Sequence, residues 1–153
     1  MEENVNTKSD LEFYEGDNMI QWKDAYKLGV EVIDAQHKRL FDLTQEAEEL
    51  LNGSEYMDKY DEIIRILNEL REYVKYHFEE EEKILFKIQY KEFFKHKICH
   101  NDFVTYIYDL DLEYLDLNQN ESILKLLNKL NEWLIEHVLV EDRAWVKVYQ
   151  EIN

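Results

Sequence analysis

The sequence contains no proline, and only three glycines occur among its 153 residues. Because proline and glycine are the residues that most often end or weaken a helix, their scarcity favours long, uninterrupted helices. The single cysteine, Cys99, cannot form an internal disulfide, which is typical of proteins in a reducing compartment. Residues 1–4 are acidic and polar, unlike the basic start of a secretory signal. We therefore expect an all-α, cytoplasmic protein.

Long apolar runs and basic clusters are also missing. No window approaches eighteen consecutive apolar residues, so no membrane-spanning helix is expected. Basic residues number 18 against 35 acidic ones, which gives a net charge of −17, and no Lys/Arg cluster interrupts the acidic pattern. This charge repels nucleic-acid phosphates and anionic lipids, so we expect neither nucleic acid nor membrane as a partner. With 45% hydrophobic residues, the chain is expected to form a single domain over residues 1–153.

Apolar residues recur at alternating spacings of three and four through most of the chain, which is the period of one helical face. Residues 1–17 lack this period and are expected to form a polar arm, and residues 19–30 an ordered, non-helical segment laid over the bundle. Turn-forming residues occur at 52–54 and 118–120. Because short loops make successive helices antiparallel, we predict an up-down-up-down four-helix bundle with a core over about residues 31–138. The predicted helices span residues 31–51, 55–87, 91–117 and 121–138, followed by a short C-terminal helix over residues 140–152.

All five histidines fall on the predicted apolar faces of these helices. A single histidine on an apolar face is more often a satisfied core residue than a metal ligand. Five on converging faces do not fit that explanation, because the faces offer almost no hydrogen-bond partners. Two carboxylates accompany them, since Glu81 follows His77 by four residues and Asp142 follows His137 by five. We therefore predict a metal centre made by His37, His77, Glu81, His96, His100, His137 and Asp142.

Seven candidate ligands are too many for one tetrahedral ion, so a closed structural zinc site is not expected. Imidazole and carboxylate without thiolate suit Fe, Zn, Cu or Mn. Two ions that share the carboxylates fit better. If a solvent-derived oxygen also bridges the two ions, all six coordination positions of the ion with three histidines are filled. The ion with two histidines keeps one open position, suited to a small ligand such as O2. The assignment is His96, His100 and His137 to the first ion, His37 and His77 to the second, and Glu81 and Asp142 to both.

The identity, order and spacing of these residues resemble the seven-ligand signature of the hemerythrin family, particularly its bacterial single-domain members. The resemblance covers roughly residues 22–142 and includes the dipeptides at 36–37, 77–78 and 133–134. It implies two iron ions, Fe2+ or Fe3+, bridged by Glu81, Asp142 and an oxo or hydroxo group. O2 would bind reversibly at the iron held by His37 and His77.

The resemblance also implies a dry pocket for O2, which would slow the loss of the iron-bound species to water. Two residues depart from the family pattern: Leu85 stands where many members have Met, and Lys91 where many have Pro. Neither departure removes a ligand. The residues that would wall the pocket are Leu85, Trp133, Leu134 and Val138.

The sequence leaves three kinds of function open. The first is a non-enzymatic O2 carrier, store or scavenger, with a client oxygenase or redox protein as partner. The second is a di-iron oxidase or peroxidase acting on O2, peroxide or nitric oxide. The ferritin-like version of such an enzyme is disfavoured, because no Glu stands three residues before any His. The third is an O2 sensor that works through a separate partner.

Two neighbouring features are assigned structural roles. In the acidic run 79–82, only Glu81 shares the face of His77, and the other three residues are expected on a solvated face. Cys99 precedes His100 by one position and points about 100° away from it on a helix. We expect Cys99 to be a small packing residue.

Overall fold

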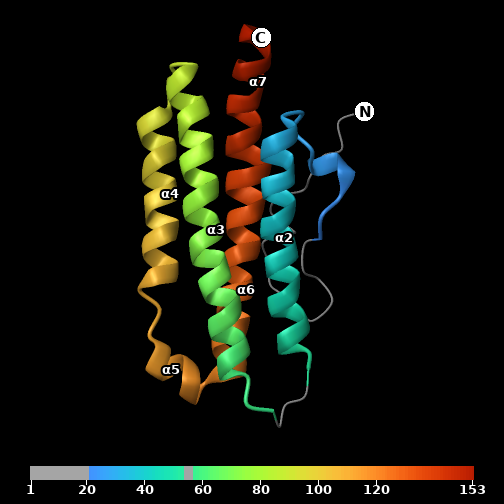
Figure 1. Ribbon diagram of the computed structural model, residues 1–153, viewed down its shortest axis with the longest axis vertical. Helices are drawn as coiled ribbons and strands as arrows, with labels where there is room; N and C mark the ends of the chain where they lie inside the picture. Colours follow the sequence, from blue (N-terminus) through green and yellow to red (C-terminus); the bar gives the residue numbers. More distant parts are fainter. Residues whose placement is uncertain (1–20, 54–56) are drawn as a thin grey trace.

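The computed structural model describes residues 21–53 and 57–153, and the regular structure within them is entirely helical (Figure 1). This confirms the predicted all-α class. The polar arm predicted over residues 1–17 lies outside the described residues. None of the described helices combines the length and apolar content needed to span a bilayer. In chain order the elements are the 3-10 helix η2 (Asp24–Tyr26), α2 (Glu31–Leu51), α3 (Tyr60–Lys87), α4 (Phe93–Tyr108), α5 (Leu112–Leu117), α6 (Gln119–Trp133), the π-helix η3 (Leu134–Asp142) and α7 (Arg143–Ile152).

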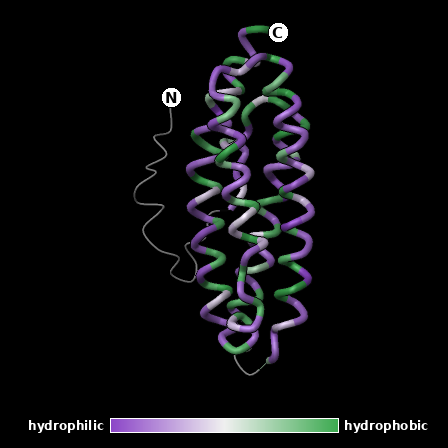
Figure 2. The backbone as a smooth tube through the Cα atoms, turned by 90° about the vertical axis from the view of Figure 1, so that its left-hand side faces the viewer, coloured by the Kyte–Doolittle hydropathy of each residue, from purple (hydrophilic) through white to green (hydrophobic). Residues whose placement is uncertain are grey.

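Four long rods run along one axis of the molecule, as Figures 1 and 2 show. They are α2, α3, α4 and the continuous rod formed by α6, η3 and α7. Helix α2 packs against α3 and α6, and α3 packs against α4. The predicted apolar faces form the core: Ile33 and Leu67, for example, are fully buried. Burying each such side chain contributes roughly 1.5–3 kcal/mol, so the helical period of the sequence translates directly into the bundle.

The described part of the segment before α2, residues 21–30, packs on the bundle as predicted, but the prediction that it is non-helical is wrong, because the 3-10 helix η2 lies within it. The ring of Tyr26 stacks on that of Phe41, with centroids 5.6 Å apart. The buried carboxylate of Asp34 accepts hydrogen bonds from the backbone N–H groups of Leu28, at 2.7 Å, and Gly29, at 3.1 Å. Gly29 has φ +102°, a backbone conformation that favours glycine. These contacts fix the angle at which the chain enters α2.

The third predicted helix, over residues 91–117, is interrupted at residues 109–111, so the prediction of one continuous helix is wrong. Helix α4 ends at Tyr108, and the chain restarts as the short helix α5. Asp111 causes the restart, because its side chain accepts hydrogen bonds from the backbone N–H groups of Glu113 and Tyr114 and so caps α5. The restart rotates the buried face. Leu115 is buried, whereas Tyr114 and Leu117, which lie on the predicted apolar stripe, are exposed.

The sequence predicted that the fourth and C-terminal helices are separate elements. In the structure they form one rod. Its middle section, η3, is a π-helix of nine residues. A π-helix forms i to i+5 hydrogen bonds and is frequently found at functional sites. This section carries His137 and Asp142.

Candidate metal centre

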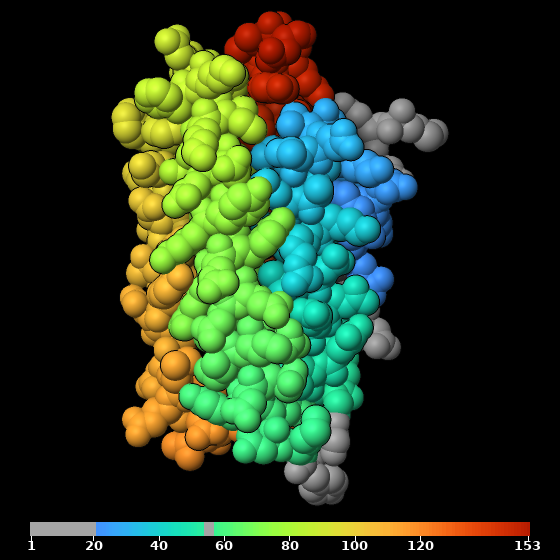
Figure 3. All heavy atoms as spheres, in the orientation of Figure 1, coloured from blue at the N-terminus to red at the C-terminus, as the bar shows by residue number. Residues whose placement is uncertain are grey.

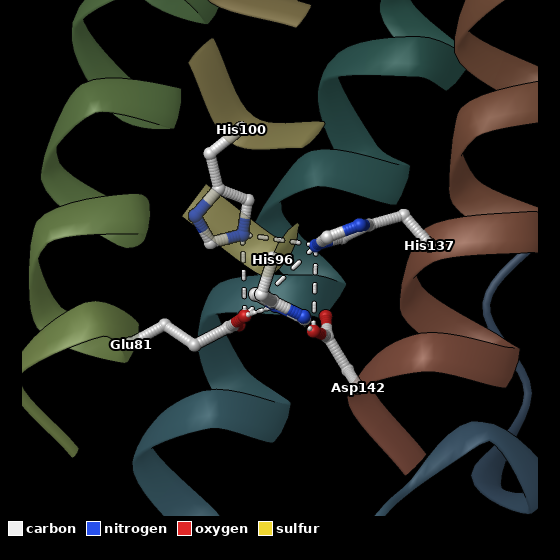
Figure 4. A group of neighbouring side chains, drawn as sticks. All are labelled: Glu81, His96, His100, His137 and Asp142. Carbon is white, nitrogen blue, oxygen red and sulfur yellow. Dashed lines mark hydrogen bonds and ion pairs between the residues drawn. The ribbon is translucent and has the colours of Figure 1, made fainter. Parts of the chain in front are cut away.

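Seven side chains that the sequence predicted as ligands converge between the rods. None is more than 4% exposed. Residues four apart on a helix share a face, which places two candidates from α3 and two from α4 toward the same point. Figure 4 shows five of the seven pointing toward one another. Helix α2 supplies His37, α3 supplies His77 and Glu81, α4 supplies His96 and His100, and η3 supplies His137 and Asp142.

The π-helix explains how the last two residues share a face. In an α-helix, residues five apart are separated by about 140° around the axis, because each residue turns by about 100°. In the i to i+5 geometry of a π-helix, the same two residues lie almost one above the other. His137 and Asp142 are five apart, and His137 Nε2 lies 3.4 Å from Asp142 Oδ1. The local departure from α-helical geometry therefore brings Asp142 into the centre.

The seven side chains form two groups that share both carboxylates. Within each group, one ligand atom per residue lies within 4.8 Å of all the others. The larger group has three imidazoles and the smaller has two, with Glu81 and Asp142 common to both. The structure thus brings together all seven predicted residues and separates the histidines into a group of three and a group of two. The larger group contains His96, His100 and His137, and the smaller contains His37 and His77.

The inward-facing atoms of the smaller group fit a cation. His37 Nε2 lies 3.0 Å from Asp142 Oδ2 and 3.8 Å from Glu81 Oε2, which is close enough for ion pairs. None of these three atoms has a hydrogen bond, and neither does His77 Nε2. A buried polar atom without a partner costs free energy of about 1–3 kcal/mol. Because several such atoms converge on one point, a metal ion that binds them all is the partner that satisfies them.

Three of the histidines are oriented through the ring nitrogen that faces away from the centre. His77 Nδ1 lies 2.7 Å from Gln36 Oε1, His100 Nδ1 lies 3.0 Å from Glu82 Oε2, and His137 Nδ1 lies 3.0 Å from Glu141 Oε2. Because these oxygens accept hydrogen bonds, they place the ring proton on Nδ1 and leave Nε2 free to bind a metal. This is the support that metal-ligating histidines almost always have.

Comparison with known proteins agrees with this geometry. The profile of the Hemerythrin HHE cation binding domain matches residues 28–149. Bacteriohemerythrin from Clostridium acetobutylicum is 38% identical over 128 residues, which are 84% of this chain and 99% of that protein. Bacteriohemerythrin from Pseudomonas aeruginosa is 27% identical over 82% of this chain and 78% of its own length, and that from Campylobacter jejuni 26% over 79% and 88%.

The chain belongs to the hemerythrin family. Membership implies a non-haem di-iron centre, and the buried cluster of histidines and carboxylates provides residues that can hold metal ions. These relatives are named bacteriohemerythrins, which favours the non-enzymatic alternative among the functions that the sequence leaves open.

In the metal-free state of this hemerythrin, the two carboxylates favour protonation of neighbouring imidazoles. Burial lowers the pKa of His37, but the negative charges of Asp142 and Glu81 outweigh burial and raise it to about 9. The same balance raises the pKa of His96 to about 10. Burial prevails at His77, whose pKa is lowered. Burial favours protonation of Glu81, but the surrounding imidazoles hold its pKa well below the ordinary value. The metal-free cluster therefore attracts positive charge, as a cation site must.

The residues assigned to the ligand pocket do not all lie together. Leu134 and Val138 are buried in the largest apolar cluster, and Leu85 is buried in the cluster that contains Trp145. Trp133 is half-buried, and its ring stacks on that of His137 with centroids 4.7 Å apart. Trp133 therefore supports the three-histidine group. O2 is expected at the other group, which has two histidines, so Trp133 is not placed as a wall of the O2 pocket.

Sequence reasoning missed the residues that orient the ligands. Glu82, which was expected on a solvated face, is half-buried and accepts from His100. Trp145 Nε1 donates to Asp142 Oδ1 at 3.1 Å from a fully buried ring. Glu141 follows His137 by four residues, and Trp145 follows Asp142 by three, so helical spacing was an available signal for both. No spacing signals Gln36 or Glu82, because each supports a histidine on another helix.

Proposed function

We propose that this hemerythrin binds O2 reversibly at a pair of iron ions. The three-histidine group would hold one ion and the two-histidine group the other, and Glu81, Asp142 and an oxo or hydroxo group would bridge them. The proposal depends on one observation: the two groups share the same carboxylates but differ by one imidazole. The ion with fewer protein ligands keeps a position for a small ligand. A pair of ferrous ions would supply the electrons that O2 binding requires.

The surroundings of the centre favour binding over turnover. Val138 is fully buried and Leu134 is 1% exposed, and both lie in η3 beside His137. Their side chains contain no polar atoms and exclude water, and water would otherwise promote oxidation of the iron. We therefore favour a carrier, store or scavenger in the cytoplasm, with a client oxygenase or redox protein, over an oxidase, a peroxidase or a sensor.

The first test is the iron content together with the visible spectrum of the anaerobically reduced protein. The spectrum is recorded before air is admitted, after it is admitted and after it is removed. The proposal expects two irons per chain and charge-transfer bands that appear in air and fade on deoxygenation. Bands that persist after deoxygenation would indicate stable oxidation and favour the oxidase or peroxidase alternative.

A substitution in the smaller group tests the division of the ligands. We expect His77→Ala to keep the ion of the three-histidine group, to lose the second ion and to abolish the O2 spectrum. The neighbouring Tyr76→Ala is the control, because Tyr76 is 51% exposed and outside both groups. Two irons and a normal O2 spectrum in His77→Ala would contradict the assignment.

A further inference from the structure

The end of α3 and the start of α4 carry an exposed aromatic surface that the metal centre does not use. Phe86 is 74% exposed, Phe94 78% and Ile98 58%. The ring of Phe93 contacts both other phenylalanines, with centroids 6.0 Å from Phe86 and 5.3 Å from Phe94. Ile98 follows Phe94 by one helical turn. A contiguous apolar surface of this kind on a soluble protein marks a site of interaction.

The three phenylalanines line a cleft of about 720 Å³ at one corner of the molecule. In Figure 3 this corner is the yellow-green region at the upper left. The fully buried Leu85 lines the base of the cleft, and Gln89 completes its wall. The α3–α4 patch is defined here as Phe86, Lys87, Tyr90, Phe93, Phe94 and Lys97, which line the cleft, together with Lys91 in the turn between α3 and α4.

The patch is basic in an acidic protein. Residues 83–98 contain five lysines and one acidic residue, a net charge of +4, and the rest of the chain has 13 basic against 34 acidic residues. The sequence was expected to lack a basic cluster, because apolar residues separate these lysines along the chain. Lys87 and Lys97 line the cleft, and all five lysines are exposed. They are Lys83, Lys87, Lys91, Lys95 and Lys97.

Most of this positive charge is available to a partner. Lys83 pairs with Glu80 at 3.1 Å, and Lys97 lies 3.8 Å from Glu82. The other three lysines form no ion pair with any residue that the structure describes. Exposed charges beside an aromatic centre form the arrangement of a protein interface, in which the charged rim selects the partner and the apolar centre supplies binding energy.

We propose that the α3–α4 patch is the docking surface of an acidic partner protein. The partner would place an apolar side chain in the cleft and carboxylates against Lys87, Lys91 and Lys97. This inference rests on the charge and exposure of the patch and does not depend on O2 binding.

Two other occupants fit the patch less well. A symmetric dimer through this surface would set the lysines of one patch against the same lysines of the other, and such like-charge contacts oppose association. A flat anionic membrane would first meet the end of α7, which extends beyond the α3–α4 turn in Figure 1 and ends with Glu151 close to the C-terminus. A recessed cleft suits a protruding side chain of a protein better than a plane.

The patch is also close to the metal centre. Tyr90 lines the cleft, and its ring lies edge-on to that of His96 with centroids 6.5 Å apart. A docked partner would therefore be separated from a candidate ligand by one side chain. This position suits a partner that exchanges a small molecule or electrons with the centre.

The test measures binding of two small acidic electron carriers, a [2Fe–2S] ferredoxin and a flavodoxin, to the iron-loaded protein by isothermal titration calorimetry. The variant K87E/K91E/K97E reverses the charge of the patch. The control K38E/K125E/K147E makes the same change of charge at exposed lysines elsewhere. A third variant, F86A/F94A, removes the aromatic centre, and its melting temperature should match the wild type because both rings are exposed.

We expect at least one probe to bind, with affinity that falls when salt is raised from about 50 to about 300 mM. The patch triple variant should weaken binding by about tenfold or more and the control by much less, and F86A/F94A should also weaken it. Three results would overturn the proposal: no binding of either probe at low salt, equal losses in the two triple variants, or self-association or binding to phosphatidylserine vesicles that F86A/F94A abolishes.

Discussion

At the residue scale, the metal centre depends on side chains that touch no metal ion. Glu141 Oε2 lies 3.0 Å from His137 Nδ1, and Glu82 holds His100 in the same way. Both carboxylates support the three-histidine group, whereas His77 in the smaller group is supported by the neutral amide of Gln36. A negatively charged acceptor makes the imidazole a stronger ligand. The three-histidine group should therefore bind its ion more tightly.

Removing one supporting carboxylate tests this difference. Glu141→Ala should lower the affinity of the three-histidine group by roughly 10- to 100-fold and leave the bundle folded. A competition titration with Zn2+ and a chromophoric chelator measures both affinities. Glu136→Ala, an exposed site in the same π-helix, is the matched control and should bind like the wild type. Equal affinities in the two variants would show that Glu141 does not support the ligand.

Gly29 offers a second test at this scale, in the segment that precedes α2. A Cβ at this position would lie 2.6 Å from Gln150 Nε2, and the φ of +102° is strained for any other residue. Gln150 would have to give up its hydrogen bond to Leu28 O, now 3.3 Å. We expect Gly29→Ala to lower the free energy of unfolding by about 1–2 kcal/mol. Urea denaturation should show a lower midpoint with an unchanged m-value, and Gly53→Ala, which lacks the positive φ, should change it little.

At the element scale, the spacing of apolar residues predicted both ends of α2 correctly. It also placed each histidine on the buried face of its own helix. It could not predict the end of α4, because no glycine or proline marks it. The cause is the cap made by Asp111, which a helical pattern tolerates as a surface residue. The π-helix was also missed, since a search for the α-helical period treats the five-residue spacing of His137 and Asp142 as an interruption. That spacing was the signal for it.

A deletion within the π-helix tests its role. Val140 is 52% exposed, so its removal deletes little packing but returns η3 to α-helical spacing. Asp142 should then rotate by about 100° away from the histidines. We expect the deletion variant to remain helical by circular dichroism and to lose the binding of two irons, whereas Val140→Ala retains it. Two tightly bound irons in the deletion variant would show that the π-helix is not required.

At the scale of the whole molecule, the bundle encloses two carboxylates and five imidazoles in an apolar interior. The carboxylates need positive charge, which a pair of metal ions supplies in the loaded protein and protons supply in the metal-free protein. Folding, metal binding and protonation are therefore linked. The five histidines could be assigned to this centre from sequence because their faces converge. The competition between protons and metal ions depends on distances that only the folded chain provides.

This linkage predicts opposite responses of the metal-free and loaded proteins to alkaline pH. In the metal-free protein the pKa of His37 is raised from 6.5 to about 9, and that of His96 to about 10. A raised pKa in the folded state stabilises the fold fully below pH 6.5, and this contribution is lost as the pH rises through 9 to 10. Urea denaturation of the metal-free protein should therefore show falling stability between about pH 7 and pH 10. The loaded protein should not show this loss, because its imidazoles bind metal instead of protons.

Metal binding near pH 7 should release about two protons per chain, measured by calorimetry in buffers of different ionisation enthalpy. A metal-free protein with constant stability over this range, or metal binding without proton release, would contradict the assignment of positive charge to these two imidazoles.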